Sequence, residues 1–346
     1  ITGATDVEFC IATGNLAITT PLNASGTVRL RTSNGSITQS SAGVITAANL
    51  GAWATGNVDL NTLVNAVSNT FAARSNTTGV VEFQNNQGFA VGTITAGASC
   101  FPATAGATTA NGNIDIDANA GNLTVNNVVT AGLAGTVTLN ADAGAVNLNA
   151  AVSSSTGQID ITADSVNQNA GGNISTGAVA AINVTADNGS ITMAGGTTTT
   201  SSTGTITYDA TANVALSQLI STSGPINVTA GSGAITDNLV SEAANLSTSG
   251  TVTLDAETGI GSAGGAADID TTIGTLVATN RTSGNIVIQE TSGLIVAGTG
   301  VQTLAGNGSI SIDVDAGNLT INSVVTAHGA GTVTLNADSG TIDINA

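Results

Sequence analysis

A short strand-like unit recurs along this chain at a nearly constant interval. In the copy GTVTLNAD at Gly135, Val137, Leu139 and Ala141 alternate with Thr and Asn, the period-two pattern of a β-strand with one apolar face. The first seven units begin at Gly112, Gly135, Gly157, Ala180, Gly204, Gly224 and Gly250, with steps of 23, 22, 23, 24, 20 and 26 residues. Three more begin at Gly284, Gly308 and Gly331. A sustained interval of this kind indicates a repeat architecture.

Each unit contains more than one strand. A second short strand starts nine residues after the first, as in GAVNLNA at Gly144, and a weaker third follows, as in NAAVSSSTG. One unit cannot bury its apolar face alone, whereas stacked units bury a continuous core. We therefore predict an all-β fold, a parallel β-solenoid with three short strands per turn of about 23 residues. The structural alternative, a β-sandwich, would need hairpins and longer, more varied strands.

The longest duplication shows which positions are free to vary. Residues 121–144 read GNLTVNNVVTAGLAGTVTLNADAG, and residues 317–340 repeat 19 of these 24 positions. Val125 is replaced by Ile321, which keeps an aliphatic residue on the expected inner face, while Gly132 is replaced by His328 at an expected turn. A stacked structural repeat tolerates this pattern of change better than a catalytic site does.

The first part of the chain differs from the rest. All five Phe residues, the single Trp and both Cys lie before residue 102, so we divide the chain into an aromatic-containing solenoid start, 1–101, and regular solenoid repeats, 102–346. Within 61–75, Leu63, Val64, Val67 and Phe71 have helical spacing, which predicts a short helical insertion. An irregular loop is the alternative there. The 34-residue step from Gly250 to Gly284 predicts a loop around GIGSAGGAADID.

The charge balance restricts the partners. The formal net charge is −18, with four Arg and no Lys, so nucleic acid is not an expected partner. The same balance disfavours anionic lipid surfaces. No apolar run is long enough for a transmembrane segment. The first residues resemble mature or internal sequence, and the last unit stops within a repeat, so we expect a processed chain or a piece of a longer one.

The two cysteines, Cys10 and Cys100, suit a disulfide formed in an extracellular compartment. The alternative is a pair of buried free thiols. Two cysteines are too few for a zinc site of known spacing.

Three segments carry a resemblance to a known family: 121–144, GAITDNLVSEAANLSTSGTVTLDAETGIGS at Gly233, and GFAVGTITAG at Gly88. They are similar to the β-helical shafts of filamentous-haemagglutinin-like proteins of bacteria, over most of the chain from about residue 79. The resemblance implies a secreted, extracellular or cell-surface protein, and we expect a non-enzymatic structural or adhesive role. The ends of a solenoid expose unpaired strand edges, so we also expect self-association by end-to-end or lateral β-edge contacts. The resemblance does not identify a ligand; host or cell-surface glycans or proteins are the other partners that we expect. The family's secretion-signal domain is not recognisable.

A carbohydrate-active β-helix enzyme, a polysaccharide lyase or a glycosidase, is the functional alternative. Paired carboxylates that share one face of a strand could act as acid and base on a sugar. Such pairs occur at Asp115 and Asp117, Asp268 and Asp270, and Asp313 and Asp315. The single His, His328, is matched by Gly132 in the duplicate, and we expect it in a solvent-facing turn.

A recurring Ala-Asp corner is the metal candidate. Asp142, Asp164, Asp187 and Asp338 each follow an inward aliphatic residue by five positions. Stacked turns would place such carboxylates about 5 Å apart, where they repel unless they are solvated or bridged by a cation. We expect no cofactor other than Ca²⁺ at these four residues; an ordinary Asx-type turn is the alternative.

Overall fold

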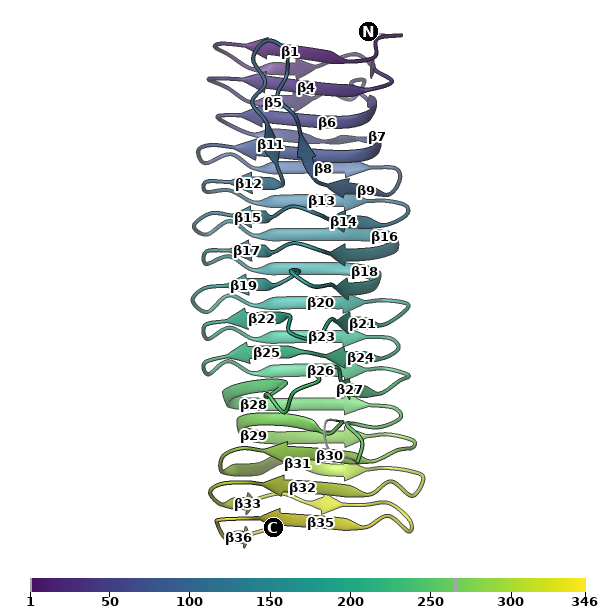
Figure 1. The fold of residues 1–346 in the computed structure, drawn as a ribbon, viewed down its shortest axis with the longest axis vertical. Helices are drawn as coiled ribbons and strands as arrows, with labels where there is room; N and C mark the ends of the chain where they lie inside the picture. The colour runs from purple at the N-terminus through teal and green to yellow at the C-terminus, as the bar shows by residue number, and fades with distance from the viewer. Residues whose placement is uncertain (1, 264–266) are drawn as a thin grey trace. The chain divides into compact units, whose positions relative to one another are not determined.

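The computed structural model describes residues 2–263 and 267–346, which form strands, turns and bends and contain no helix. The chain divides into two units, residues 1–177 and 178–346, each of which is a parallel β-solenoid (Figure 1). The two together contain about 15 turns, so the predicted parallel β-solenoid is confirmed. No helix of the described residues could span a lipid bilayer.

The strands of the first unit are mostly three to six residues long. They are β1 (Val7–Ile11), β2 (Leu16–Ile18), β3 (Leu22–Asn23), β4 (Thr27–Thr32), β5 (Ile37–Gln39), β6 (Ile45–Ala54), β7 (Val58–Ser75), β8 (Val81–Asn85), β9 (Phe89–Val91), β10 (Thr93–Ile94), β11 (Thr104–Ala105), β12 (Ala107–Thr109), β13 (Ile114–Ala118), β14 (Leu123–Val125), β15 (Val129–Ala131), β16 (Val137–Leu148), β17 (Val152–Ser154), β18 (Ile159–Gln168) and β19 (Ile174–Thr176).

Three parallel ladders run through the first unit, one for each strand of a turn. In the ladder β8–β13–β16–β18, Ile114 pairs with Val137 and Val137 with Ile159, and all three side chains are fully buried. The ladders β14–β16–β18 and β12–β15–β17–β19 are built in the same way. Each buried aliphatic side chain contributes roughly 1.5–3 kcal/mol. The alternation that defines a strand in the sequence is therefore also what fills the core.

The aromatic residues are stacked inside the first unit. The rings of Phe71 and Phe83 lie parallel with centroids 4.1 Å apart, and Phe89 meets Phe83 edge-on at 5.2 Å. The three come from β7, β8 and β9. Larger side chains thus fill the core here in the same inward positions that aliphatic residues occupy in later turns.

The predicted helix at 61–75 is wrong, because these residues belong to the long strand β7. Backbone pairing decides the outcome: β7 pairs with β6 on one side and with β8, β9 and β12 on the other. Val67 and Phe71 face the core, whereas Leu63 and Val64 lie at a corner and are only partly buried. Helical spacing arose because corners interrupt the period-two pattern, and tertiary pairing overrides such a local signal.

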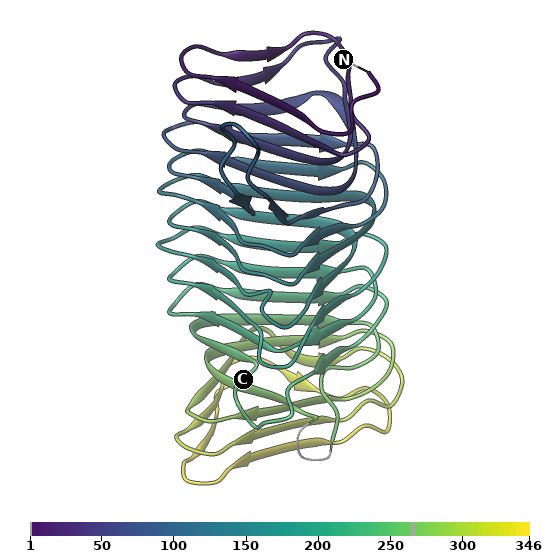
Figure 2. The same cartoon turned by 45° about the horizontal axis from the view of Figure 1, so that its top comes forward.

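One segment of the first unit leaves the solenoid path. Residues 92–106, here called the strap, contain the antiparallel pair β10–β11 and lie between β9 and β12 in the sequence. The strap runs back across the outer face of earlier turns to reach β1 (Figures 1 and 2). Ile94 and Phe101 from the strap pack on Ala72 and Trp53. The first turns are therefore covered on one outer face by later sequence.

The second unit repeats the three-strand turn. Its strands are β20 (Ile182–Ala186), β21 (Ile191–Met193), β22 (Thr198–Ser201), β23 (Ile206–Ala210), β24 (Val214–Leu216), β25 (Gln218–Ser221), β26 (Ile226–Ala230), β27 (Ile235–Asp237), β28 (Leu246–Ala256), β29 (Ile269–Asn280), β30 (Ile286–Glu290), β31 (Leu294–Thr303), β32 (Ile310–Val314), β33 (Leu319–Ile321), β34 (Val325–Thr326), β35 (Val333–Ala337) and β36 (Ile342–Ile344).

An insertion in the second unit moves the repeat by one ladder. The units at Gly204, Gly224 and Gly250 stack as β23–β26–β28. After the 34-residue step, the unit at Gly284 begins on the neighbouring ladder, because Ile260 bridges β27 to Ile286 of β30. Residues 264–266 of the expected loop lie outside the described residues. The flanks of that loop are joined by a hydrogen bond from the Ser262 N–H to the Ala267 carbonyl oxygen, at 2.7 Å.

Candidate functional site

Within the described ranges, three groups of residues bring carboxylate oxygens or cysteine sulfurs close enough to hold one metal ion. One such atom from each residue of a group lies within 4.8 Å of the others. The groups are Glu8 with Cys10 and Cys100, Glu242 with Asp268 and Asp270, and Asp313 with Asp315 and Asp338. They differ in which donors already contact the acidic oxygens.

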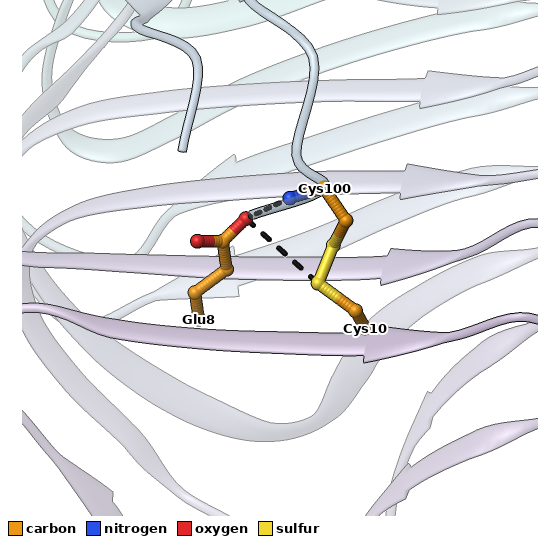
Figure 3. A group of neighbouring side chains, drawn as sticks. All are labelled: Glu8, Cys10 and Cys100. Atoms are coloured by element: carbon orange, nitrogen blue, oxygen red, sulfur yellow. Dashed lines mark hydrogen bonds between the residues drawn. A yellow bond between two sulfur atoms is a disulfide. The ribbon is translucent and has the colours of Figure 1, made fainter. Parts of the chain in front are cut away.

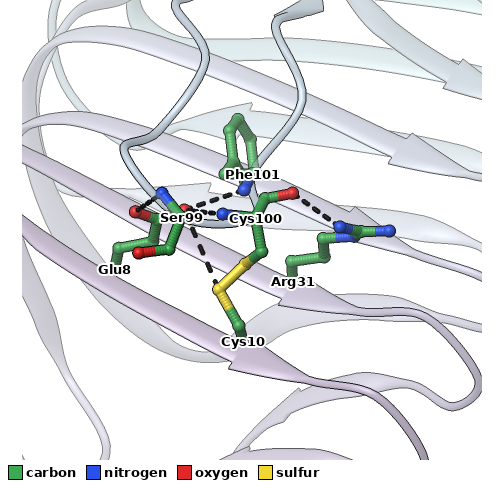
Figure 4. Close-up of a disulfide and its surroundings, with 6 residues drawn as sticks. All are labelled: Glu8, Cys10, Arg31, Ser99, Cys100 and Phe101. Atoms are coloured by element: carbon green, nitrogen blue, oxygen red, sulfur yellow. Dashed lines mark hydrogen bonds between the residues drawn. A yellow bond between two sulfur atoms is a disulfide. The ribbon is translucent and has the colours of Figure 1, made fainter.

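The first group is a clamp between β1 and the strap. Cys10 and Cys100 form a disulfide with Cα atoms 6.2 Å apart, beside the Glu8 carboxylate (Figure 3). That carboxylate accepts hydrogen bonds from the backbone N–H groups of Ser99, Cys100 and Phe101 at 3.1, 2.8 and 2.8 Å (Figure 4). These bonds, that from Cys100 foremost, hold the pKa of Glu8 below its usual value. The sulfur atoms of Cys10 and Cys100 are bonded to each other, so this first group offers no thiolate to a metal.

Two arginines strengthen the clamp. Arg31 donates from Nη1 to the Cys100 carbonyl oxygen at 2.6 Å, and its guanidinium lies 5.0 Å from the centre of the Trp53 ring (Figure 4). Arg29 donates from Nε to the Thr95 carbonyl oxygen at 3.0 Å. Half of the chain's four basic residues therefore fix the strap to the first turns.

The second group lies where two loops of the second unit meet. Asp237 ends β27, Glu242 lies in the loop 238–245, and Asp268 and Asp270 lie at the start of β29. Asp237 is close enough to raise the pKa of Asp268 and Asp270. These four residues, Asp237, Glu242, Asp268 and Asp270, are called the acidic cluster below.

Three carboxylates of the acidic cluster have buried oxygens without donors. Asp270 is only 2% exposed, and its Oδ2 accepts no hydrogen bond from any described residue. The same holds for Oδ1 of Asp268 and Oδ2 of Asp237. A buried acceptor without a donor costs about 1–3 kcal/mol, and more when it is charged. This arrangement is the least satisfied polar site in the described part of the second unit.

Asn245 fixes the backbone and side chains around the cluster. Its side-chain Nδ2 donates to Oδ1 of Asp237 at 2.5 Å, and its Oδ1 accepts from the backbone N–H of Asp270 at 3.0 Å. The Asn245 backbone N–H donates to the Asp270 carbonyl oxygen at 2.8 Å. Asn245 is fully buried, so it holds the carboxylate of Asp237 and the backbone of Asp270 in place, while Oδ2 of each aspartate has no donor among the described residues.

Burial first, and then the neighbouring carboxylates with Asp268 foremost, together raise the pKa of Asp270 to about 7. Burial also raises the pKa of Asp268. A group of this kind can share a proton between carboxylates or bind a hard cation. It could also supply a general acid.

No arginine neutralises the acidic cluster. Arg281 is the only Arg in residues 178–346, and that part of the chain has no Lys. Its guanidinium is bound to Asp255 at 3.1 Å and to Glu257 at 2.9 Å. The cluster therefore has no protein cation to balance its charge.

In the third group, side-chain amides donate hydrogen bonds to the carboxylates. Asn336 donates from Nδ2 to Asp313 at 2.9 Å and to Asp338 at 2.7 Å, and Gln289 donates to Asp315 at 3.3 Å. Each carboxylate of this group thus has a donor within the described residues.

The predicted pair Asp115 and Asp117 lies on the outer face of β13, as strand alternation requires. Burial first, and then the charge of Asp142, raise the pKa of Asp117 to about 6, against the lowering effect of a hydrogen bond from Gln84. The pair lies beside polar strand residues, and no basic residue of the described chain forms an ion pair with it.

The corner aspartates proposed for Ca²⁺ are mostly exposed. Asp142 follows Ala141 and Asp164 follows Ala163, and these two alanines pair between β16 and β18, so successive corners adjoin as expected. None of the three close groups in the described residues includes Asp142, Asp164 or Asp187. Calcium binding at these corners stays a prediction.

His328 lies at an exposed turn. Its Nδ1 is 2.8 Å from the Gly306 carbonyl oxygen, and its backbone N–H donates to Thr303 Oγ1 at 2.8 Å. These contacts connect neighbouring turns and bring no nucleophile to the ring.

Sequence reasoning named Asp268 and Asp270 as a pair but missed Asp237 and Glu242. The signal that could have found them is the irregular spacing of the repeat. The 26- and 34-residue steps carry the extra residues of both loops, and each loop brings a carboxylate to the same place.

Comparisons with protein-family models, with curated proteins and with solved structures return no match.

Proposed function

We propose that this chain is a non-enzymatic structural shaft of a secreted bacterial surface protein, similar to filamentous-haemagglutinin-like proteins, and that copies of it associate through β-edges. The observation that carries the proposal is the continuity of the inner ladders. Ile114, Val137 and Ile159 in the first unit, and the paired Ile286 and Ile310 in the second, are at most 1% exposed. In such a molecule most inward-facing residues build one repeated core, and successive turns carry similar side chains.

An oxidising location agrees with the clamp. A disulfide between Cys10 and Cys100 persists in extracellular compartments and is rare in reducing ones. The sequence separation of 90 residues means that the bond ties the strap to a turn formed far earlier in the chain. This supports an extracellular or cell-surface location for the proposed shaft.

Self-association is proposed at the face formed by β34–β36. Val333, Ile342 and Ile344 are 42%, 40% and 67% exposed, although their ladder partners Ile310, Leu319 and Ile321 are almost fully buried. Strand edges with unpaired backbone groups and exposed aliphatic residues favour pairing with another strand. A further turn would extend these ladders and cover the apolar residues, and we propose that the purified chain obtains one from another copy.

Electron microscopy and light scattering of the purified chain test this proposal. We expect filaments for the wild type and their loss in Ile344→Asp, because a charge on that face opposes stacking. Leu304→Asp is the matched control, since Leu304 is 50% exposed elsewhere in the second unit. Monodisperse wild-type monomers without filaments would contradict the self-association.

A carbohydrate-active enzyme is the second candidate, favoured by one observation: a carboxyl in the acidic cluster whose pKa is about 7, a value suited to a general acid. Against it, Tyr208 is the only aromatic residue in 178–346 and is fully buried, so it offers no stacking surface for a sugar. Release of reducing ends or unsaturated sugars from acidic and neutral polysaccharides, abolished in Asp270→Asn, would support the enzyme and overturn the structural proposal.

A further inference from the structure

We propose that the acidic cluster is a binding site for a single Ca²⁺ ion, held by carboxylate oxygens of Glu242, Asp268 and Asp270 with Asp237 beside them. This inference is independent of the proposed structural role. It rests on distance, on burial and on the absence of donors within the described residues.

The spacing of the oxygens suits calcium. Ligand oxygens of Glu242, Asp268 and Asp270 all lie within 4.8 Å of one another. Two oxygens on opposite sides of a Ca²⁺ ion are about 4.8 Å apart, because Ca–O distances are roughly 2.4 Å. Mg²⁺ demands near-ideal octahedral geometry at about 2.1 Å and loses its water reluctantly, so a group made mainly of protein carboxylates suits Ca²⁺ better.

The need for a cation comes from the buried oxygens. Asp270 is only 2% exposed, its carboxylate contributes an oxygen to the group, and its Oδ2 accepts no hydrogen bond from any described residue. Oxygens of Asp268 and Asp237 share this lack. Buried charges in proteins are paired or coordinate metals, and here no Arg is available to pair.

The other two close groups show what a filled site looks like. Glu8 is contacted by backbone N–H groups, and Asp313 and Asp338 are contacted by the Asn336 amide. Their oxygens are absent from the buried atoms that lack partners. The acidic cluster alone, among the described groups, combines close carboxylates with buried oxygens that have no donor.

The surroundings are built for an ion. Asn245 orients Asp237 and the backbone of Asp270, as the second layer of residues around a metal orients its ligands. Glu242 is exposed, so one side of the group remains open to solvent. Ca²⁺ accepts six to eight oxygens, and water can complete its coordination from that side.

Isothermal titration calorimetry of the full chain with CaCl₂, after removal of metals with EDTA, tests the proposal. We expect the wild type to bind Ca²⁺ in the range of about 0.1–1 mM, typical of extracellular modules, or more tightly. Asp270→Asn removes a charged ligand and should weaken this binding at least about tenfold. Mg²⁺ should bind more weakly than Ca²⁺.

Asp209→Asn is the matched control, because Asp209 is an exposed aspartate on β23 of the same unit, outside the cluster. It should bind Ca²⁺ as the wild type does. Thermal unfolding gives a second readout: Ca²⁺ should raise the unfolding temperature of the wild type and of Asp209→Asn, but not of Asp270→Asn. Wild-type protein that binds no Ca²⁺, or Asp270→Asn that binds it unchanged, would overturn the proposal.

Discussion

The strap of the first unit and the two loops around the acidic cluster of the second unit both interrupt the repeat, yet they treat a carboxylate in opposite ways. Glu8 accepts backbone hydrogen bonds from three consecutive strap residues, which lower its pKa. Asp270 is buried among other carboxylates, and its pKa rises to about 7.

The difference shows that departures from a solenoid repeat have two distinct consequences. The strap brings its own donors, a disulfide and an aromatic side chain, so it fastens turns together without a ligand. The loops of the acidic cluster bring like charges, so they are incomplete until a proton or cation joins them. A segment of the first kind stabilises the fold, and we propose that one of the second kind binds a cation.

The largest expected effect comes from cutting the strap's covalent link. Replacing Cys10 and Cys100 together by Ala should destabilise the first turns by about 2–5 kcal/mol, because the bond closes a long loop. Chemical unfolding followed by the fluorescence of Trp53, which packs beside the strap, measures this. Wild-type protein under reducing conditions is the control and should show the same loss; an unchanged midpoint would contradict the clamp.

A smaller effect is expected from adding a methyl group to the tightly packed contact between Gly51 and the strap. A Cβ added to Gly51 would lie 2.5 Å from Cζ of Phe101 and 2.9 Å from Cγ2 of Ile94. Gly51→Ala should therefore push the strap outward and cost about 1–3 kcal/mol. Gly293→Ala is the matched control, since its nearest neighbour is an oxygen at 3.3 Å. Equal stability of Gly51→Ala and the wild type would show that Phe101 is not held there.

The smallest expected effect is a change in how the stability of the fold depends on acid pH. The folded pKa of Glu8 lies below its usual 4.5, so its contribution is present above that value and is lost as the pH falls through the folded pKa. Asp6, whose pKa is lowered first by the Thr27 N–H and then by Arg29, acts in the same direction. Glu8→Gln should therefore lose less stability than the wild type between neutral pH and about pH 3. Identical acid dependence of the two proteins would refute this role of Glu8.

The regular part of the fold follows from the sequence because one rule suffices there. Alternation in units such as 137–141 places aliphatic residues inward, and stacking supplies the rest. The rule failed at 61–75, where Leu63 and Val64 lie at a corner and mimic helical spacing. Corners are set by pairing with neighbouring turns, which a local pattern does not contain.

The acidic cluster was only half predictable for a related reason. Asp268 and Asp270 are two residues apart, so strand alternation places them on one face. Asp237 ends β27 and Glu242 lies in the loop after it, and their approach to Asp268 and Asp270 depends on how far the insertion shifts the repeat between ladders. The sequence shows the insertions as irregular steps but does not fix where their side chains meet.

The most direct test of the contrast is the thermal unfolding of Glu8→Gln and Asp270→Asn, side by side, near neutral pH with EDTA present. Glu8→Gln should unfold at a lower temperature than the wild type, because a satisfied carboxylate loses its charge. Asp270→Asn should unfold at a higher temperature, because removing an unsatisfied buried charge relieves about 1–3 kcal/mol. A lower unfolding temperature for both variants would contradict the account.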